Sequence, residues 1–332
     1  MIFVTGGTGL LGSHLLFQLA QQDVSIKAIY RNKEKIKTVQ KVFEYYAPEN
    51  HTELFSKINW VFCDVLDIVS LEEEMEGATI VYHCAALVSF NRRDFYKMMK
   101  INREGTANVV NTALLKGVKK LGYVSSTAAI GGEDKIVTEA TKWKQSPETS
   151  GYSISKYSAE KEVWRAVEEG LDVVIVNPCL IVGAGNWEES SMTIFNTIDK
   201  GLKFYTPGAN AFVDARDVAS ILVQLVDSTI KNERFLCIGE NVSFKAMFDL
   251  IANQLGKKAP SIKVAKFLMS ITWIVAGLVS RITGKRPAIT KETARSSFNI
   301  TVYDPSKIKQ ALNFQFRTLE ETVENAVKGR VR

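Results

Sequence analysis

The chain has 332 residues, of which 46% are hydrophobic and 23% are charged. These ordinary values exclude disorder, collagen and coiled coil as the main state, and a chain of this length can bury a large core. The formal net charge is only +6 and no run of Lys or Arg dominates, so nucleic-acid binding is not expected. The cysteines, which predict reduced thiols in a cytoplasmic protein without a metal site, are Cys63, Cys84, Cys179 and Cys237.

Two segments have the apolar character of membrane segments. Residues 1–22 lack a basic start and are interrupted by glycines, which favours strand, turn and helix over a signal peptide. Residues 267–280 carry no charge but fall short of the roughly 20 residues that span a bilayer. We expect a buried helix there and no stable membrane insertion. Contact with a membrane surface and the lining of an apolar substrate pocket are the alternatives.

Strand and helix patterns alternate along the first half of the chain. Apolar strands are expected at residues 2–5, 24–30, 58–63, 79–84, 121–125 and 173–177, and helices at 10–22, 33–46, 68–75, 92–116 and 152–169. Repeated strand-then-helix units predict an α/β fold with a doubly wound, Rossmann-type parallel sheet. The continuous apolar run at 173–176 is typical of a strand that is covered on both faces.

The regular alternation of strand and helix patterns ends after Pro178. A loop and helix are expected at 183–207, a strand end and helix at 211–226, a strand at 234–238, a helix at 243–255 and mainly helix beyond. We therefore predict a dinucleotide-binding domain formed by residues 1–177 and about 211–240. Residues 178–210 and 241–332 are expected to form a smaller, mostly helical substrate-binding domain.

A glycine-rich turn follows the first strand and opens the first helix. Gly6 permits a sharp turn, Gly9 lets the backbone approach a pyrophosphate, and Gly12 lets the helix pack closely on the strand. The helix amino terminus adds free N–H groups and partial positive charge. The alternative is a structural turn without a ligand. The residues predicted to bind a dinucleotide here are Gly6, Thr8, Gly9, Leu10, Leu11 and Gly12.

The end of the second strand favours NADP(H) over NAD(H). An NAD site usually places an acidic residue there to bind the ribose 2′-hydroxyl, but this strand ends Tyr30-Arg31-Asn32-Lys33. Arg31 can pair with a 2′-phosphate, which a carboxylate would repel. A solvated start of the next helix is the alternative interpretation, and NAD(H) stays open.

Tyr152 and Lys156 are four residues apart and share one helix face. A free tyrosine has a pKa of about 10, and a nearby ammonium lowers it towards the range of a useful acid or base. Such a tyrosine can give or take the proton of a substrate oxygen. The overlapping pair Tyr157 and Lys161 has the same spacing, so one of the two matches is a coincidence.

These residues and several later segments resemble the extended short-chain dehydrogenase/reductase family, which includes the NAD-dependent epimerases and dehydratases. The resemblance covers nearly the whole chain and is specific for fold and cofactor. The motif Y-x-x-S-K-x-x-A-E begins at Tyr152 and thereby selects it over Tyr157. The other matching segments are the glycine turn, Asp64-Val65, His83-Cys84-Ala85-Ala86, Asn102-Arg103-Glu104-Gly105-Thr106, residues 125–132, Asn177-Pro178 and residues 212–219.

The resemblance implies a role for each matching residue. Tyr152 is the implied acid and base, and Lys156 holds the nicotinamide ribose and lowers the tyrosine pKa. A third hydroxyl would bind the substrate oxygen: counting back from Gly132 selects Thr127, and counting from Gly131 selects Ser126 as the alternative. Further implied cofactor contacts are Asp64, Val65, Ala85, Ala86, Asn102 and Pro178, and further substrate contacts are Ser89 and Asn177.

The departures from the family pattern narrow the expected reaction. Where related dehydratases carry Asp-Glu, this chain has Ala128-Ala129, which argues against dehydration of a sugar nucleotide. Arg31, Cys179 after Asn177-Pro178, and the helical tail resemble the branch of dihydroflavonol reductases, aldehyde reductases and 3β-hydroxysteroid dehydrogenases. We expect reduction of a ketone or aldehyde to an alcohol. The apolar segment at 267–282 favours a hydrophobic carbonyl compound or a lipid-linked sugar as the substrate.

Two other functions remain as alternatives. An epimerase acting on a nucleotide sugar would retain NAD and return the hydride to the same substrate. A redox sensor would only bind the dinucleotide, but the intact pair of Tyr152 and Lys156 argues against it. The resemblance also implies a homodimer formed through the helices at 92–116 and 152–169.

Overall fold

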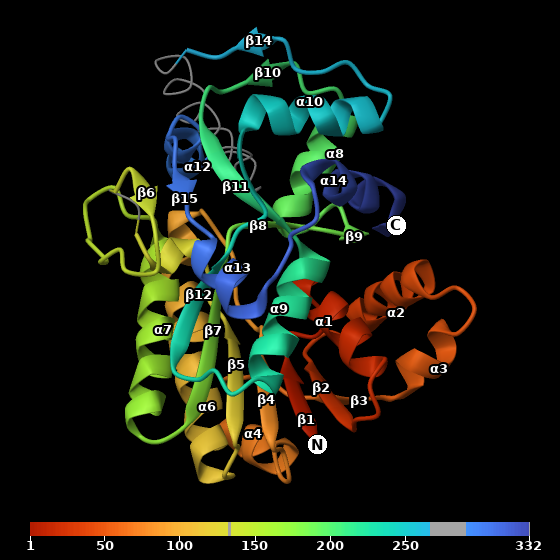
Figure 1. Ribbon diagram of the computed structural model, residues 1–332, viewed down its shortest axis with the longest axis vertical. Coiled ribbons are helices and arrows are strands. Elements are labelled where there is room, and N and C mark those ends of the chain that lie inside the picture. Colours follow the sequence, from red (N-terminus) through yellow and green to blue (C-terminus); the bar gives the residue numbers. More distant parts are fainter. Residues whose placement is uncertain (132–133, 266–289, 332) are drawn as a thin grey trace.

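Seven parallel strands form the central sheet of the computed structural model, which describes residues 1–131, 134–265 and 290–331 (Figure 1). Their order is β12-β7-β5-β4-β1-β2-β3, and every neighbouring pair is parallel. The predicted α/β sheet is thus confirmed. The strands are β1 (Ile2–Thr5), β2 (Ile26–Tyr30), β3 (Ile58–Phe62), β4 (Ile80–His83), β5 (Lys120–Val124), β7 (Asp172–Pro178) and β12 (Glu233–Cys237).

The strand order reverses between β1 and β4. The chain runs from β1 outward to β2 and β3, then returns to place β4, β5, β7 and β12 on the other side of β1. In such sheets the loops leaving the carboxyl ends of the two central strands diverge and open a crevice. Here those loops begin at Gly6 and Cys84, so the crevice lies beside the glycine turn.

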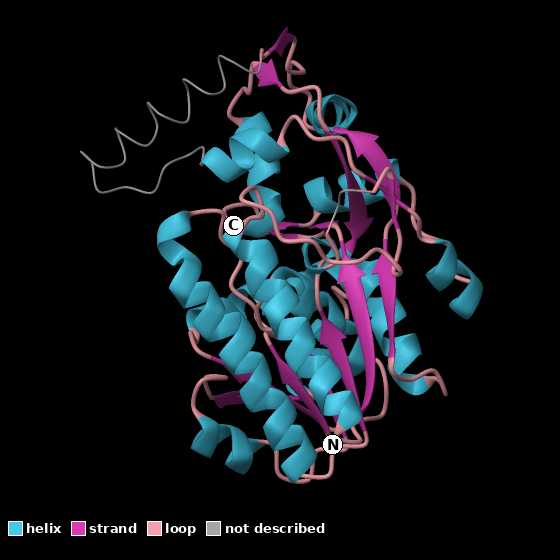
Figure 2. Cartoon of the chain, turned by 90° about the vertical axis from the view of Figure 1, so that its left-hand side faces the viewer, coloured by secondary structure: helices cyan, strands magenta, loops and turns pink. Residues whose placement is uncertain are grey.

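Helices cover both faces of the sheet, and each face packs against its helices through a buried hydrophobic cluster (Figures 1 and 2). One face packs against α1 (Leu10–Ala20), α2 (Glu34–Tyr46), α3 (His51–Ser56) and α9 (Ala215–Asp227). The other packs against α4 (Ile68–Glu74), α6 (Gly105–Leu115) and α7 (Gly151–Glu168). The helix α3 was not predicted.

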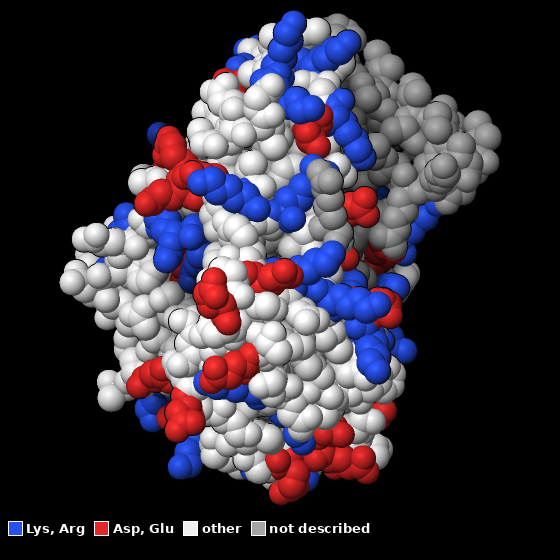
Figure 3. All heavy atoms as spheres, turned by 90° about the vertical axis from the view of Figure 1, so that its right-hand side faces the viewer, with Lys and Arg blue, Asp and Glu red and all other residues white. Residues whose placement is uncertain are grey.

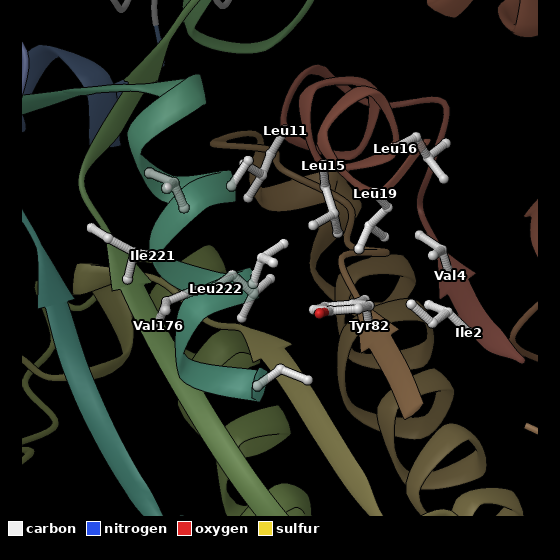
Figure 4. Close-up of a cluster of buried hydrophobic side chains, with 14 of the residues drawn as sticks. Ile2, Val4, Leu11, Leu15, Leu16, Leu19, Tyr82, Val176, Ile221 and Leu222 are labelled. Carbon is white, nitrogen blue, oxygen red and sulfur yellow. The ribbon is translucent and has the colours of Figure 1, made fainter. Parts of the chain in front are cut away.

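The apolar spacing of α1 explains its place on the sheet. Leu11, Leu15 and Leu19 recur every four residues and lie against Ile2, Val4 and Tyr82 (Figure 4). On the same face, Ile221 and Leu222 of α9 pack beside Val176. Burying a leucine or isoleucine side chain contributes about 1.5–3 kcal/mol, so this cluster holds both helices to the sheet.

The segment expected as one helix at 92–116 is divided. It has a 3-10 turn at Arg92–Asp94, α5 (Phe95–Met98), a π-helical turn at Met99–Glu104, and then α6. The wide turn brings the side chains of Asn102 and Thr106 into the interior, where both are buried. Turns of this kind are frequent at functional sites. The apolar spacing alone could not reveal this interruption, because the residues on both sides remain helical.

The remaining described residues build a second group of elements above the carboxyl ends of the main strands (Figure 1). Strand β11, which was expected with the dinucleotide-binding part, pairs with β8 and β13 and not with the main sheet. Strand β12 belongs to the main sheet, and helix α9 packs on that sheet. The division into two domains stays a prediction. The new elements are β8 (Leu180–Val182), α8 (Thr193–Asp199), β11 (Ala209–Asp214), β13 (Glu240–Ser243), α10 (Phe244–Gln254) and α14 (Leu319–Lys328).

The carboxyl-terminal residues return to the main body through short strand pairs. β15 (Val302–Tyr303) pairs with β6 (Ile136–Val137), and β16 (Arg330–Val331) pairs with β9 (Gly185–Asn186). The first pair brings Tyr303 towards the loop after β5. Three more short elements are β10 (Phe204–Tyr205), which pairs with β14 (Ile262–Lys263), and α12 (Lys291–Ser296). Between β15 and α14 lies α13 (Ser306–Leu312).

Basic and acidic side chains are interspersed on the face shown in Figure 3, in keeping with the dispersed charge of the sequence. Among the helices that the structure describes, none is both long and apolar enough to cross a membrane. The predicted apolar helix at 267–280 lies outside the described residues.

Candidate active site

The glycine turn is held in a conformation that only glycine accommodates at two positions. Gly6 has a φ of +71°, and a Cβ atom built on it would lie 2.5 Å from the backbone nitrogen of Ala85. A Cβ atom on Gly12 would overlap the carbonyl oxygen of Gly6. The turn therefore lies directly against the loop after β4, and α1 lies directly against the turn. The close packing at Gly12 and the sharp turn at Gly6 were predicted, whereas the contact of Gly6 with the loop after β4 was not.

The geometry of this turn fits a dinucleotide. Gly9 is exposed and stands at the amino-terminal cap of α1, where no side chain among the described residues satisfies the first amides of the helix. Those amides include the backbone N–H groups of Leu10 and Leu11, which have no acceptor within their own helix. An anion such as a pyrophosphate would receive these hydrogen bonds and the positive end of the helix dipole. Thr8 is half-buried beside them.

Arg31 and Asp64 lie together at the edge of this turn. The Nη1 atom of Arg31 is 3.6 Å from Oδ2 of Asp64, and both side chains are largely exposed. Such a pair contributes at most about 1 kcal/mol, so the guanidinium can turn towards a phosphate. The other carboxylate oxygen of Asp64 accepts the N–H of Leu66. Val65 is buried, and its carbonyl oxygen accepts from Asn108.

Tyr152 stands in the first turn of α7. Ser150 caps this helix by accepting the N–H of Ser153 at 3.0 Å, which places Tyr152 just inside the helix start. Its ring meets Phe90 edge to face, with the centroids 5.8 Å apart. Burial raises the pKa of Tyr152 above its usual value, and a hydrogen bond with Ser126 acts in the opposite direction.

The expected effect of Lys156 on Tyr152 is not found in this arrangement. Lys156 is buried, and its Nζ atom donates to the hydroxyl of Tyr123 and to the carbonyl of Val124, each at 2.9 Å. Its ammonium is thus directed at β5, and the raised pKa of Tyr152 contradicts the predicted lowering. Burial also lowers the pKa of Lys156 to about 8.

The two candidate hydroxyls have different partners. Ser126 caps a short 3-10 turn at Thr127–Ala129 by accepting the N–H of Ala128, and it shares a hydrogen bond with Tyr152. Thr127 is buried, and its hydroxyl bonds to that of Tyr303. Ser126, the alternative of the two counts, is thus the hydroxyl that acts on Tyr152, and which of the two hydroxyls binds the substrate stays a prediction. Gly132, from which Thr127 was counted, lies outside the described residues.

Asn102 was expected to touch the cofactor, but its side chain amide is engaged within the protein. Its oxygen accepts the N–H of Leu87 at 2.7 Å, and its nitrogen donates to the carbonyl of Leu87 and to Oγ of Ser155. Asn102 thus fastens the loop after β4 to α7. In that loop, Ser89 donates to Asp94 at 2.6 Å. Ala85 and Ala86 precede it, beside the glycine turn.

Asn177 was expected to touch substrate, but it is fully buried. Its amide nitrogen donates to the carbonyl of Ser126 at 3.0 Å and to Oε2 of Glu160 at 2.9 Å. Glu160 also accepts from Ser125 and from Nη1 of Arg234. This cluster holds the Ser125–Thr127 segment in place from behind. Pro178 ends β7 in the same buried layer, opposite Cys237.

Sequence reasoning missed three residues of this region. Glu160 is the last residue of the motif that selected Tyr152, so its signal was present but unused. Tyr123 and Tyr303 belong to no motif, and only the fold brings them to Lys156 and Thr127. The competing Tyr157 stacks on Trp143 with the ring planes 4° apart, outside this cluster.

Comparison with known proteins agrees with this geometry. The model of the NAD dependent epimerase/dehydratase family matches residues 2–239. A putative dihydroflavonol 4-reductase from Synechocystis sp. is 27% identical over 98% of this chain and 93% of its own. The crystal structure of gox2253 has a TM-score of 0.79 and 25% identity, covering 98% of this chain and 96% of that one. The Bordetella bronchiseptica enzyme WbmH, solved with NAD+, has a TM-score of 0.73 and 22% identity over 98% and 96% of the chains.

Proposed function

Since the chain belongs to the NAD dependent epimerase/dehydratase family, we propose that this oxidoreductase prefers NADP(H) and reduces a ketone or aldehyde to an alcohol. When bound, the dinucleotide supplies the hydride. The glycine turn would hold its pyrophosphate, Arg31 the 2′-phosphate, and Lys156 the ribose next to the nicotinamide. The chain's own chemical task is then to deliver one proton to the substrate oxygen.

The observation that carries this proposal is the place of Tyr152, which stands in the first turn of α7 with its ring against Phe90 and its side chain beside Ser126. A phenol whose pKa is raised by burial keeps its proton at neutral pH, and reduction of a carbonyl needs a proton donor. Ser126 lies within hydrogen-bonding range of that phenol and can bind the same substrate oxygen. The relative named as a reductase supports the same direction of reaction.

The surroundings of Tyr152 favour an apolar substrate. Phe90 packs on the tyrosine ring. Val88 and Tyr96, which are close to Phe90 in the sequence, are large apolar side chains exposed at the surface. Ala128 and Ala129 supply no carboxylate beside the candidate hydroxyls, which supports reduction over dehydration. A hydrophobic ketone or aldehyde would fit these contacts.

Replacing Tyr152 by Phe tests the proposal directly. We expect kcat for reduction of an apolar carbonyl to fall by about 10²- to 10⁴-fold, the usual contribution of general acid catalysis, while NADPH binding is little changed. NADPH oxidation across a panel of apolar ketones and aldehydes gives kcat, and fluorescence titration gives the dissociation constant of NADPH.

The matched control is Tyr157→Phe, which alters the overlapping motif at a ring that stacks on Trp143. This variant should keep wild-type turnover. Full activity of Tyr152→Phe would refute the assignment of the proton donor. Tightly retained NAD with no net oxidation of NADPH by any carbonyl would instead favour the epimerase.

A further inference from the structure

Lys156 is anchored by a residue that no motif identifies. Its Nζ atom donates to the hydroxyl of Tyr123 and the carbonyl of Val124 at 2.9 Å, and it lies 4.6 Å from the centre of the Tyr123 ring. Within the described part of the chain, these are the two hydrogen bonds recorded for this ammonium. One N–H is left for a bound ligand.

The hydrogen bond to Lys156 dictates the direction of the bonds behind it. An ammonium only donates, so the oxygen of Tyr123 must accept and its own O–H must find another acceptor. The Thr106 side chain lies beside it and acts on the pKa of Tyr123. The hydroxyl of Thr106 donates to the carbonyl of Asn102, so its two lone pairs remain for Tyr123 and for Nε2 of His83 at 2.9 Å.

The chain of bonds continues to the glycine turn. Because Nε2 of His83 donates to Thr106, its Nδ1 must accept, and the hydroxyl of Thr5 lies 2.6 Å from that atom. The oxygen of Thr5 in turn accepts the N–H of Ala85. Burial lowers the pKa of His83 to about 3, so the imidazole is neutral and has one donor and one acceptor. Thr5 immediately precedes Gly6.

All four side chains of this series are buried. Thr5, His83 and Tyr123 are 0% exposed and Thr106 is 1% exposed. Tyr123 also belongs to an apolar cluster between the sheet and the helices α4, α6 and α7, where an unbonded hydroxyl would be costly. A phenylalanine would fill the same volume. The hydrogen bond with Lys156 explains why this position carries a tyrosine and not a phenylalanine.

We propose that Tyr123 is the positioning residue for the Lys156 ammonium. We further propose that the series of side chains Thr5–His83–Thr106–Tyr123 couples the position of this ammonium to that of the glycine turn. One end of the series stands beside the turn that would hold the pyrophosphate, and the other end at the lysine that would hold the nicotinamide ribose. Movement of one end is thereby resisted at the other through buried polar contacts. No proton needs to travel along it.

Loss of the Tyr123 hydroxyl should disfavour the charged form of Lys156. The groups that face this ammonium are Glu160 on its own helix, His83 and Cys84 at the end of β4, and Tyr123 on β5. Glu160 and Cys84 raise the pKa of Lys156, and burial lowers it more strongly, to about 8. Removing one acceptor leaves burial less opposed, so the pKa should fall by about one unit.

The test is an NMR titration of the full-length protein labelled with ¹³C at the lysine ε carbons. Lys156→Arg identifies the signal by its disappearance. In Tyr123→Phe we expect its midpoint to move down by about one pH unit, and the dissociation constant of NADPH to rise. The titration uses no substrate or cofactor, so its result stands whichever reaction the protein catalyses.

The matched control is Tyr82→Phe, because Tyr82 is equally buried but packs on the opposite face of the sheet. This variant should leave the Lys156 midpoint unchanged. If Tyr123→Phe fails to fold in thermal unfolding, Thr106→Val, which removes the hydroxyl that links Tyr123 to His83 and Asn102 but leaves Tyr123 in place, should shift the midpoint in the same direction. A wild-type midpoint in folded Tyr123→Phe, or in Thr106→Val where Tyr123→Phe does not fold, would overturn the proposal.

Discussion

At the scale of single residues, burial moves the pKa values of Tyr152 and Lys156 away from their values in water. The pKa of Tyr152 is raised and the pKa of Lys156 is lowered to about 8, although proximity of the two was expected to lower the pKa of the tyrosine. Both shifts have desolvation as their first cause, since each charged form loses water in the interior. Tyr152 is therefore suited to donate a proton, and the Lys156 ammonium keeps hydrogen-bond acceptors in the interior through Tyr123 and Val124.

The preference for NADP(H) is a prediction about one residue. We expect Arg31→Asp to lose a charge-assisted contact to the 2′-phosphate that contributes about 1.5–3 kcal/mol, which corresponds to roughly 10- to 100-fold in affinity. The measurement is the ratio of the dissociation constants for NADH and NADPH. The contact between Arg31 and Asp64 is weak and exposed, so breaking it should not disturb folding.

Lys37→Asp provides the control for this charge change. Lys37 is exposed on α2 and forms an ion pair with nearby Glu34, so the same change in charge falls away from the expected phosphate. Its ratio of dissociation constants should stay at the wild-type value. An unchanged ratio in Arg31→Asp would remove the basis for the NADP(H) assignment.

At the scale of elements, the contact of α1 with the glycine turn determines both stability and binding. Gly12 packs on the carbonyl of Gly6, whereas Gly9 is exposed with a φ of −85°. A Cβ atom on Gly9 would lie 3.4 Å from the Gly6 oxygen, which is an ordinary contact. The two glycines of one motif thus serve different physical purposes, one inside the fold and one at its surface.

Alanine at each glycine should separate these purposes. Gly12→Ala forces α1 away from the turn and should lower the free energy of unfolding by about 1–3 kcal/mol. Gly9→Ala should lower it by less, about 0.5–1 kcal/mol because alanine caps a helix less well than glycine, yet weaken NADPH binding by about tenfold or more because its methyl group enters the anion site. Urea denaturation and cofactor titration measure the two effects. Equal stability losses in both variants would contradict this division.

At the scale of the whole molecule, residues distant in sequence are joined by buried polar contacts. Arg317 forms an ion pair with Asp217 of α9, and its backbone N–H donates to the same carboxylate. Arg234 of β12 binds Glu160 of α7 in a similar way. These contacts tie the returning end of the chain to the main sheet. The homodimer expected through the helices at 92–116 and 152–169 stays a prediction.

Removing Arg317 should destabilise the protein in a pH-dependent manner. Asp217 is 0% exposed, burial already raises its pKa, and Arg317 opposes that rise. In Arg317→Ala the carboxylate is buried without its cation, which should lower the free energy of unfolding by about 3 kcal/mol at neutral pH. This is the low end of the range for a broken buried ion pair, because the guanidinium is partly exposed. An acid whose folded pKa exceeds its unfolded value loses stability as it ionises.

The sign of this effect is opposite to ordinary acid denaturation. The loss in Arg317→Ala should be complete above the folded pKa of Asp217 and should shrink as the pH falls through that value towards about 3.9, the unfolded pKa. Urea denaturation of wild type and variant at several pH values measures it. Lys328→Ala breaks an exposed pair with Glu324 and should cost little at any pH. A loss that grows on acidification would contradict the assignment.

Local patterns were sufficient to predict much of the fold. The six strands expected in the first half all join the parallel sheet, and the glycine turn opens α1 as its spacing required. These features depend on neighbours in the sequence. The π-helical turn at Met99–Glu104 and the short strands β6, β9, β15 and β16 were not predicted, because pairs as short as two residues carry no periodicity of their own.

The sequence by itself determined the sheet, the glycine turn, the family and the identity of Tyr152 and Lys156, since each is encoded by residues within a few positions of one another. Only the tertiary structure decided which hydroxyl bonds to Tyr152, where the Lys156 ammonium points, and that Asn102 and Asn177 serve as buried supports. Those outcomes depend on burial and on partners such as Tyr123 and Tyr303. Desolvation and long-range contact exist only once the chain has closed around them.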